Sequence, residues 1–216
     1  MTEQGNRRLR GRQAEAERND RLVLEAAREV FATQGGSAPL SAVAERAGVG
    51  MGSLYRRYGS KTELLQYLCI LAMEQTIGAA RAALACDDAW TGLEGYVRDC
   101  VSFGSGALAP LAGTIPTTPR MWEISKLGPR LLDELVTSAR REGALRPDVT
   151  ALDVAWLIEL FGQRGPARPG AEDDRIHQRL LAIALDGLRA PGTTTLPGRP
   201  PSARHYESRW HLPKGG

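Results

Sequence analysis

Apolar residues recur at intervals of three and four in one segment of this chain after another, and this spacing limits the fold more than any other feature. Such spacing places apolar side chains on one face of an α-helix, whereas a half-buried strand shows strict alternation. No segment reads as a β-strand, and the sequence contains no internal repeat. The sequence therefore predicts an all-α fold.

The helices at the start of the chain can be placed by their end signals. The first is expected to begin near Asn19 or Asp20, either of which can cap it, and to end at the glycines 35–36. A short second helix is expected over about 41–47, with Ser41 as its N-cap. Gly48 then supplies the left-handed residue that ends this helix.

A third short helix and a long fourth helix follow. Leu54 and Tyr58 lie on the apolar face of the third. Ser60 and Glu63 have the spacing of a capping box, with each side chain expected to bond the backbone of the other, and the fourth helix should run to about Ala85. Further helical segments are expected at about 90–111, 127–143, 150–162 and 173–188, with a break at 116–119 and a loop at 163–170.

The stretch GVGMGSLYRRYGSKTELL, residues 48–65, has alternate glycines that resemble a phosphate-binding loop. Such a loop must follow a buried strand, but the residues before it have helical spacing and no GK[ST] follows. A short helix, a turn containing glycine and a second short helix are instead the signature of a helix-turn-helix. The alternative is a helical hairpin whose arginines, Arg56 and Arg57, simply face water.

The segment LSAVAERAGVGMGSLYRRYGSKTELL resembles the DNA-binding domain of the tetracycline-repressor (TetR) family, and AAREVFATQGG resembles its first helix. The resemblance covers roughly residues 18–76 and implies a three-helix DNA-binding domain. It implies that Tyr55 and Lys61 contact phosphates and that Ser41 lies beside the backbone. The DNA-binding residues that it implies are Ser41, Met51, Gly52, Ser53, Tyr55, Arg56, Arg57 and Lys61.

One position departs from the family pattern. Gly50 stands where the family commonly has serine, so a side-chain N-cap is lost at a cost of a few tenths of a kcal/mol. This departure puts a phosphate contact at Gly50 in doubt, but not the fold.

The second half resembles an SbtR-like subgroup of the family, through ARREGALRPDVTALDVAWLI and ALDGLRA. The resemblance implies a homodimer formed by helices at about 151–164 and 172–189. The expected domains are a flexible basic arm (1–17), a helix-turn-helix domain (18–62), a helical ligand-binding and dimerisation domain (63–190) and a Pro/Gly-rich tail (191–216) with little structure. The expected interface residues are Val154, Ala155, Ile158, Leu180, Ile183, Ala184 and Leu188.

The family resemblance implies a transcriptional regulator, most simply a repressor that leaves a palindromic operator when a small-molecule inducer binds. An activator or a ligand-independent DNA-binding protein of the same fold is the alternative. An inducer pocket is expected between about 90 and 165. Its candidate walls are Phe103, Met121, Trp122, Trp156, Phe161 and Gln163, with Arg120 and Arg164 as further polar anchors. Each could equally be a core or interface residue.

An enzyme is not expected, because no HExxH or GxSxG motif occurs and the three histidines are scattered. No cofactor or metal is expected either. The three cysteines form no CxxC pair, and we expect buried, unreactive thiols.

The absence of a long apolar run suggests no membrane partner and a cytoplasmic, nucleoid-associated protein. Charge is unevenly spread: 11 basic and 8 acidic residues over 1–67, 12 and 16 over 68–188, and 5 and 1 over 189–216. Arginines 7, 8, 10 and 12 are expected to form a mobile arm that can reach a DNA minor groove.

Overall fold

The computed structural model describes residues 3–106, 108, 114–163, 170–192 and 194–208, with side chains for all of these except 3–17, 206 and 207. The fold is all-α, as predicted: within these ranges there is no strand, and an isolated bridge joins Leu145 to Arg189. None of the described helices is long and apolar enough to cross a membrane.

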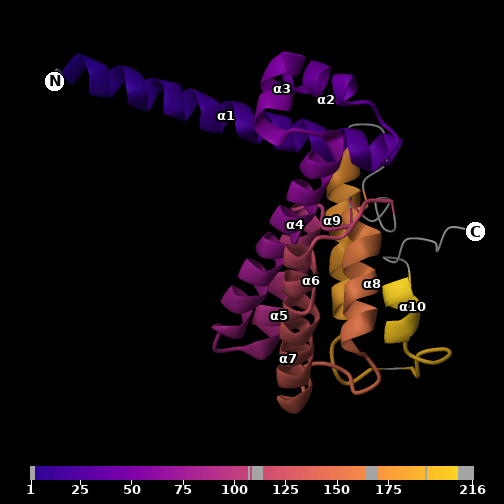
Figure 1. Cartoon of the computed structure of the whole chain (residues 1–216). Coiled ribbons are helices and arrows are strands. Elements are labelled where there is room, and N and C mark those ends of the chain that lie inside the picture. The colour runs from indigo at the N-terminus through magenta and orange to yellow at the C-terminus, as the bar shows by residue number, and fades with distance from the viewer. Residues whose placement is uncertain (1–2, 107, 109–113, 164–169, 193, 209–216) are drawn as a thin grey trace, which may run out of the picture.

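Figure 1 shows a head of three helices at one end of an elongated body of roughly aligned helices. Helix α4 leaves the head and runs down through the body, while the start of α1 projects away from it. The helices are α1 (Glu3–Gln34), α2 (Leu40–Ala47), α3 (Met51–Tyr58), α4 (Lys61–Leu84), α5 (Ala89–Ser102), α6 (Pro119–Ser125), α7 (Leu127–Arg141), α8 (Ala151–Gly162), α9 (Ala171–Asp186) and α10 (Ala203–Ser208).

The two ends of the chain contain more helix than expected. Helix α1 begins at Glu3, so the expected start near Asn19 or Asp20 is wrong. Arg, Glu, Gln, Ala and Leu fill most of 3–17, and these strong helix formers let the helix continue past two residues that could have capped it. The mobility of this arm in the absence of DNA stays a prediction. In the tail, where little structure was expected, 203–208 forms α10.

Two further helix boundaries differ from the sequence expectation. The break at 116–119 is present, but it ends in a helix that the sequence analysis missed: Pro119 is at the start of α6, and the Thr118 hydroxyl accepts a hydrogen bond from the Met121 amide at 3.2 Å. Helix α5 ends at Ser102, well short of the expected 111.

The apolar faces close two hydrophobic cores. The head core contains Phe31, Val43, Leu54, Leu64 and Leu68, all at most 1% exposed. The body core joins α4, α5, α7, α8 and α9, and its most deeply buried side chains are Leu93, Val97, Cys100, Val136, Val149 and Val154. Helix α4 contributes to both cores, from Leu64 to Leu68 in the head and from Ile77 to Ala83 in the body.

Polar contacts add to the connection between head and body. The Arg28 guanidinium of α1 donates to the Phe103 carbonyl at 2.7 Å and to the Gln75 side chain at 3.1 Å. Burial lowers the pKa of Arg28 from its usual value. The Gln66 amide donates to the Pro116 carbonyl at 2.8 Å. A displacement of the segment between α5 and α6 would therefore be transmitted to α1 and α4.

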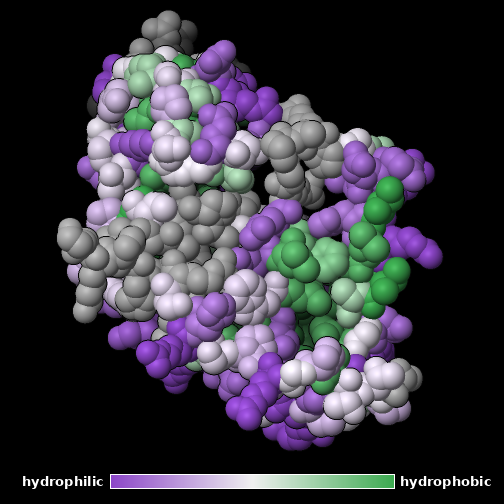
Figure 2. All heavy atoms as spheres, turned by 90° about the vertical axis from the view of Figure 1, so that its right-hand side faces the viewer, coloured by the Kyte–Doolittle hydropathy of each residue, from purple (hydrophilic) through white to green (hydrophobic). Residues whose placement is uncertain are grey.

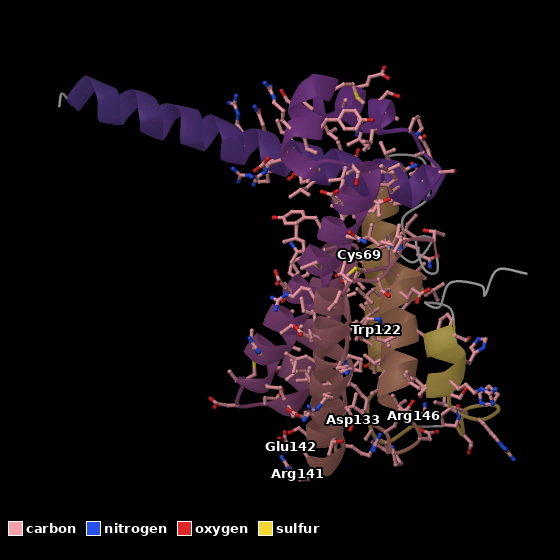
Figure 3. All side chains as sticks on the ribbon, in the orientation of Figure 1. Cys69, Trp122, Asp133, Arg141, Glu142 and Arg146 are labelled. Atoms are coloured by element: carbon pink, nitrogen blue, oxygen red, sulfur yellow. The ribbon has the colours of Figure 1, made fainter. Side chains whose placement is uncertain are left out.

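A second cluster of contacts, here called the clasp, holds the chain after α9 against the loop between α7 and α8. Arg146, only 7% exposed, donates to both carboxylate oxygens of Asp148 at 2.6 and 2.9 Å. It also donates to the carbonyls of Gly187 and Thr194, and the Leu196 amide donates to Asp148 at 3.3 Å. Figure 3 shows Arg146 at the end of the body away from the head.

The closest backbone approach between α4 and α5 requires a glycine, and this generates a stability prediction. A Cβ added to Gly92 would overlap the Ala83 carbonyl oxygen, whereas one added to Gly95 of the same helix would meet nothing within 4 Å. We expect Gly92→Ala to lower the free energy of unfolding by roughly 1–3 kcal/mol, because the helices must separate. Gly95→Ala is the matched control and should raise it by up to about 1 kcal/mol. Urea denaturation measures both, and equal effects would contradict this helix crossing.

The clasp predicts a pH dependence of stability. The Arg146 guanidinium holds the pKa of Asp148 at about 2, below the value of about 3.9 for an unfolded aspartate. The pair therefore stabilises the fold fully above the unfolded pKa and loses this effect as pH falls towards 2. Asp148→Asn should lower the urea midpoint at pH 7, and about half of the difference in unfolding free energy should be gone at pH 3. Asp87→Asn, at an exposed position, is the control. A difference that stays constant over this range would contradict the assignment.

Candidate nucleic-acid interface

The turn between α2 and α3 has the geometry that the sequence predicted. Gly48 adopts the left-handed conformation, with φ 67° and ψ 30°, and ends α2. The Val49 amide donates to the Ala44 carbonyl at 3.0 Å, which closes the turn, and the partly buried Val49 side chain packs against the head core. This turn fixes the angle at which α3 lies across the head.

The N-terminal caps of α2 and α3 are both weak. Ser41 is not the N-cap of α2: the helix begins one residue earlier, Pro39 occupies the cap position, and no side chain caps it. Ser41 lies within the first turn with an exposed side chain. Gly50 caps α3 without a side-chain hydrogen bond, as expected for glycine in place of serine.

Helix α3 has one face in the head core and one in solvent. Leu54 and Tyr58 are buried, and Met51 is partly buried against the same core. Burial raises the pKa of Tyr58 to about 12, so its hydroxyl stays protonated. On the other face Tyr55 is half exposed, and the side chains of Ser53, Arg56 and Arg57 are exposed with it.

Neighbouring side chains orient the two arginines of α3. The Arg57 guanidinium forms an ion pair with Asp20 of α1 at 2.7 Å, although its side chain remains 61% exposed. The Arg56 guanidinium donates to the Ser53 hydroxyl at 3.1 Å. Both groups keep donors that can reach a ligand, since a guanidinium carries five.

The start of α4 places a lysine beside α3. The Ser60 hydroxyl accepts from the Glu63 amide at 3.1 Å, which confirms half of the expected capping box. The other half differs, because the Glu63 carboxylate accepts from the Ser60 hydroxyl and not from its backbone amide. Lys61 is partly exposed, with its ammonium 5.9 Å from the centre of the Phe31 ring.

These residues form a cationic surface rich in hydrogen-bond donors. From Met51 to Lys61 the chain contains three basic residues and no acidic one. Backbone phosphates accept hydrogen bonds from arginine, lysine and tyrosine side chains, and an exposed helix of this size fits a DNA major groove. The roles of the individual side chains remain predictions.

The six predicted pocket residues do not meet around one cavity. Met121 packs in the head core, and Trp122 is 49% exposed on α6, halfway down the body in Figure 3. Phe103 packs at the edge of the body core, and Gln163 is exposed and donates to Glu159 at 3.3 Å. Trp156 stacks on His205, and Phe161 contacts His177 edge-on. Arg164 lies outside the described residues.

A hollow of about 450 Å³ opens instead between α4 and the α6–α7 segment. Of the residues singled out in the sequence, only Arg120 lines it, paired with Glu74 at 3.0 Å. The remaining lining residues are Ile77, Gly78, Arg81, Glu123, Ile124 and Leu127. The sequence analysis missed this hollow because its lining comes from separate helices, and their alignment is visible only in the fold.

The predicted interface residues fall into two groups. Val154 and Ile158 are 0% and 6% exposed in the chain's own core, so they cannot form a free apolar face. Their α8 spacing is equally consistent with packing against α5, and the fold places them there. Ala155, Ala184 and Leu188 are partly buried, while Leu180 and Ile183 are 51% and 57% exposed.

The exposed apolar surface on α8 and α9, here called the α8–α9 face, contains two residues that the sequence analysis missed. Leu160 is 71% exposed, and Ile176 is 48% exposed on the same side of α9 as Leu180 and Ile183. Figure 2 shows a continuous hydrophobic area on this side of the body. The spacing of 176, 180 and 183 was a signal available in the sequence.

The remaining reactive side chains form no recognisable site. Cys69 and Cys100 are buried, and burial raises the pKa of each thiol to about 11, so both remain protonated. Cys86 is an exposed free thiol, against the expectation that all three are buried. No group of three or more histidine, cysteine or carboxylate side chains lies together within the described part of the chain.

Two family models match the chain: "Bacterial regulatory proteins, tetR family" over residues 23–68, and "Transcriptional regulator SbtR-like, C-terminal domain" over residues 88–190. A comparison with curated proteins finds no match.

Solved structures show the same fold. A TetR regulatory protein from Mycobacterium vanbaalenii is 27% identical, with 82% of this chain and 99% of that chain covered and a TM-score of 0.55. A TetR regulator from Streptomyces coelicolor is 23% identical over 82% and 99%, with a TM-score of 0.56. The TetR-like regulator LfrR from Mycobacterium smegmatis, in complex with proflavine, is 22% identical over 83% and 99%, with a TM-score of 0.58. With its helix-turn-helix head and its SbtR-like C-terminal half, the chain belongs to the TetR family of DNA-binding transcriptional regulators.

Proposed function

We propose that this regulator is a homodimeric repressor that binds a palindromic operator and leaves it when a small-molecule inducer binds the C-terminal domain. The observation that carries the proposal is the exposed cationic face of α3, with Tyr55, Arg56 and Arg57 on a helix whose other face is fixed in the head core. Rigid positioning matters here, because a base contact is specific only when its donors are held in place.

In this proposal the contacts divide by role. Tyr55 and Lys61 contact phosphates, and Arg56 or Arg57 contacts a base edge. The ion pair with Asp20 fixes the direction of Arg57, which favours Arg56 as the more adaptable of the two. Ser41, Met51, Gly52 and Ser53 lie at the edge of this contact, and the basic arm reaches a flanking minor groove.

A dimer is required because one recognition helix reads only a few base pairs, too few to select a site in a genome. Two heads held about one helical turn apart, ~34 Å or a multiple, read an inverted repeat. The α8–α9 face supports this proposal, since monomeric proteins rarely leave a contiguous apolar area of this kind in water.

An inducer acts by binding better to a conformation in which the two heads have the wrong spacing. LfrR in complex with proflavine is a relative of the same fold whose structure contains a small molecule. The contacts of Arg28 and Gln66 provide a physical connection between the body and the head here. Linkage requires that DNA weaken inducer binding by the same factor as inducer weakens DNA binding.

The alternative is an activator, or a DNA-binding protein that needs no ligand. Mapping the bound DNA sites in cells, starting with the gene's own upstream region, identifies target promoters. Deletion of the gene should raise output from those promoters if the protein is a repressor. A fall in output would show an activator, and no bound sites would exclude both.

The DNA contacts generate a prediction for Lys61. Lys61→Ala should weaken binding to specific and non-specific DNA alike, and should reduce the slope of log affinity against log salt by about one. Arg56→Ala or Arg57→Ala should instead cost about 1–3 kcal/mol on the operator and relax specificity at one position. Fluorescence anisotropy at several salt concentrations measures these effects.

Lys126→Ala is the matched control, because this exposed lysine lies between α6 and α7, away from the head. Thermal melting of each variant checks that loss of the Lys61 contact with Phe31 does not unfold the head. If Tyr55→Phe combined with Lys61→Ala left both affinities unchanged, the proposed interface would be wrong.

The α8–α9 face generates a prediction for Ile183. Ile183→Asp places a charge on a surface that the dimer would remove from water, and should weaken the dimer by about ten- to a hundredfold. Sedimentation should show a dimer at micromolar concentration for the natural chain and a folded monomer for the variant. Thr137→Asp, at an exposed position of α7, is the control. A variant that remains dimeric would place the interface elsewhere.

A further inference from the structure

We propose that the C-terminal strap, residues 194–208, forms part of the dimer interface, where α10 lies on α8 beside the α8–α9 face and contacts the second copy of the chain. This inference rests on the proposed homodimer. It adds to that proposal a segment whose sequence suggested only a Pro/Gly-rich tail.

The clasp gives the strap a fixed starting point. The carbonyl of Thr194 accepts from Arg146, and the amide of Leu196 donates to Asp148. Immediately before the strap, the Ala190 amide donates to the Ala144 carbonyl at 3.0 Å. An almost fully buried arginine is committed to this anchor, so the chain leaves the body in a defined direction.

An aromatic contact then holds α10 against the body. The rings of His205 and Trp156 stack with their centres 6.1 Å apart and their planes at 20°. A helix of six residues is far below the ~12–15 residues needed for stability in isolation, so α10 depends on its docking site. Figure 1 shows α10 beside α8, on the side of the body opposite α5.

The docking site borders the α8–α9 face. Trp156 and Leu160 are four residues apart on α8 and therefore lie on the same side of this helix. Leu160 is 71% exposed, which shows that the strap covers the beginning of this side and leaves its end open. A second copy that covers Leu160, Leu180 and Ile183 would approach α10 at the rim of the same contact.

Charge favours the second copy as the occupant. The segment 189–216 carries 5 basic and 1 acidic residues, a net +4, whereas 68–188 carries 12 and 16, a net −4. Arg204 of α10 is exposed, as is Asp186 at the end of α9. A basic strap at the rim of an acidic body is complementary to a second copy of that body, and such rim contacts respond to salt.

Two truncations test the proposal. A chain that ends after Leu196 keeps the clasp and loses α10, whereas a chain that ends after Ser208 keeps both. The dimer dissociation constant, measured by sedimentation of the full chain and of each truncation, should rise about three- to tenfold on removal of α10, the effect of losing an aromatic contact at an interface. The truncation after Ser208 should retain at least half of that difference, and the difference should shrink between 50 and 500 mM NaCl.

His205→Ala in the full chain gives a second measurement, since it removes the ring contact without shortening the chain. It should weaken the dimer in the same direction as the truncation after Leu196, with an unchanged melting profile of the head. An unchanged or tighter dimer in both variants would overturn the strap's role. A natural chain that is monomeric at all concentrations would instead overturn the proposed homodimer itself.

Discussion

Helix α4 packs into both hydrophobic cores, and the position of the head relative to the body depends on that packing. Leu64 and Leu68 are completely buried in the head, and Ala80 is completely buried in the body, less than four helical turns away. A helix with side chains fixed at both ends cannot tilt in one core without disturbing the other. The Ser60 cap fixes its start beside α3, so any tilt of α4 also moves the cationic face.

The contacts around Arg28 make this connection specific to one segment. A buried guanidinium needs acceptors, and here these come from Gln75 of α4 and the carbonyl of Phe103 at the end of α5. The chain after Phe103 also contributes Leu108, Ile115 and Met121 to the head core. The hollow between α4 and α6–α7 lies along the same connection, so a molecule bound there would act on the helix that carries the head.

The surface of the body combines features that suit association. Apolar side chains remain exposed along α8 and α9, while the clasp and the stacked rings hold the strap at their edge. Neither feature is needed for the core of a single chain. Both have a simple physical reason if a second copy covers them, because the apolar area would leave water and the strap would gain a second surface.

The sequence by itself determined the helical fold, the helix-turn-helix and its turn, because these depend on local spacing and on Gly48 in a left-handed conformation. Tyr55, Arg56 and Arg57 could be placed in the same way, since they lie on one short helix. Tertiary structure alone decided that Val154 and Ile158 face the core while Leu160 faces solvent, because an apolar stripe does not reveal its partner. It also decided the hollow, the clasp and the strap, since residues such as Arg146 and Thr194 meet only after the intervening helices have packed.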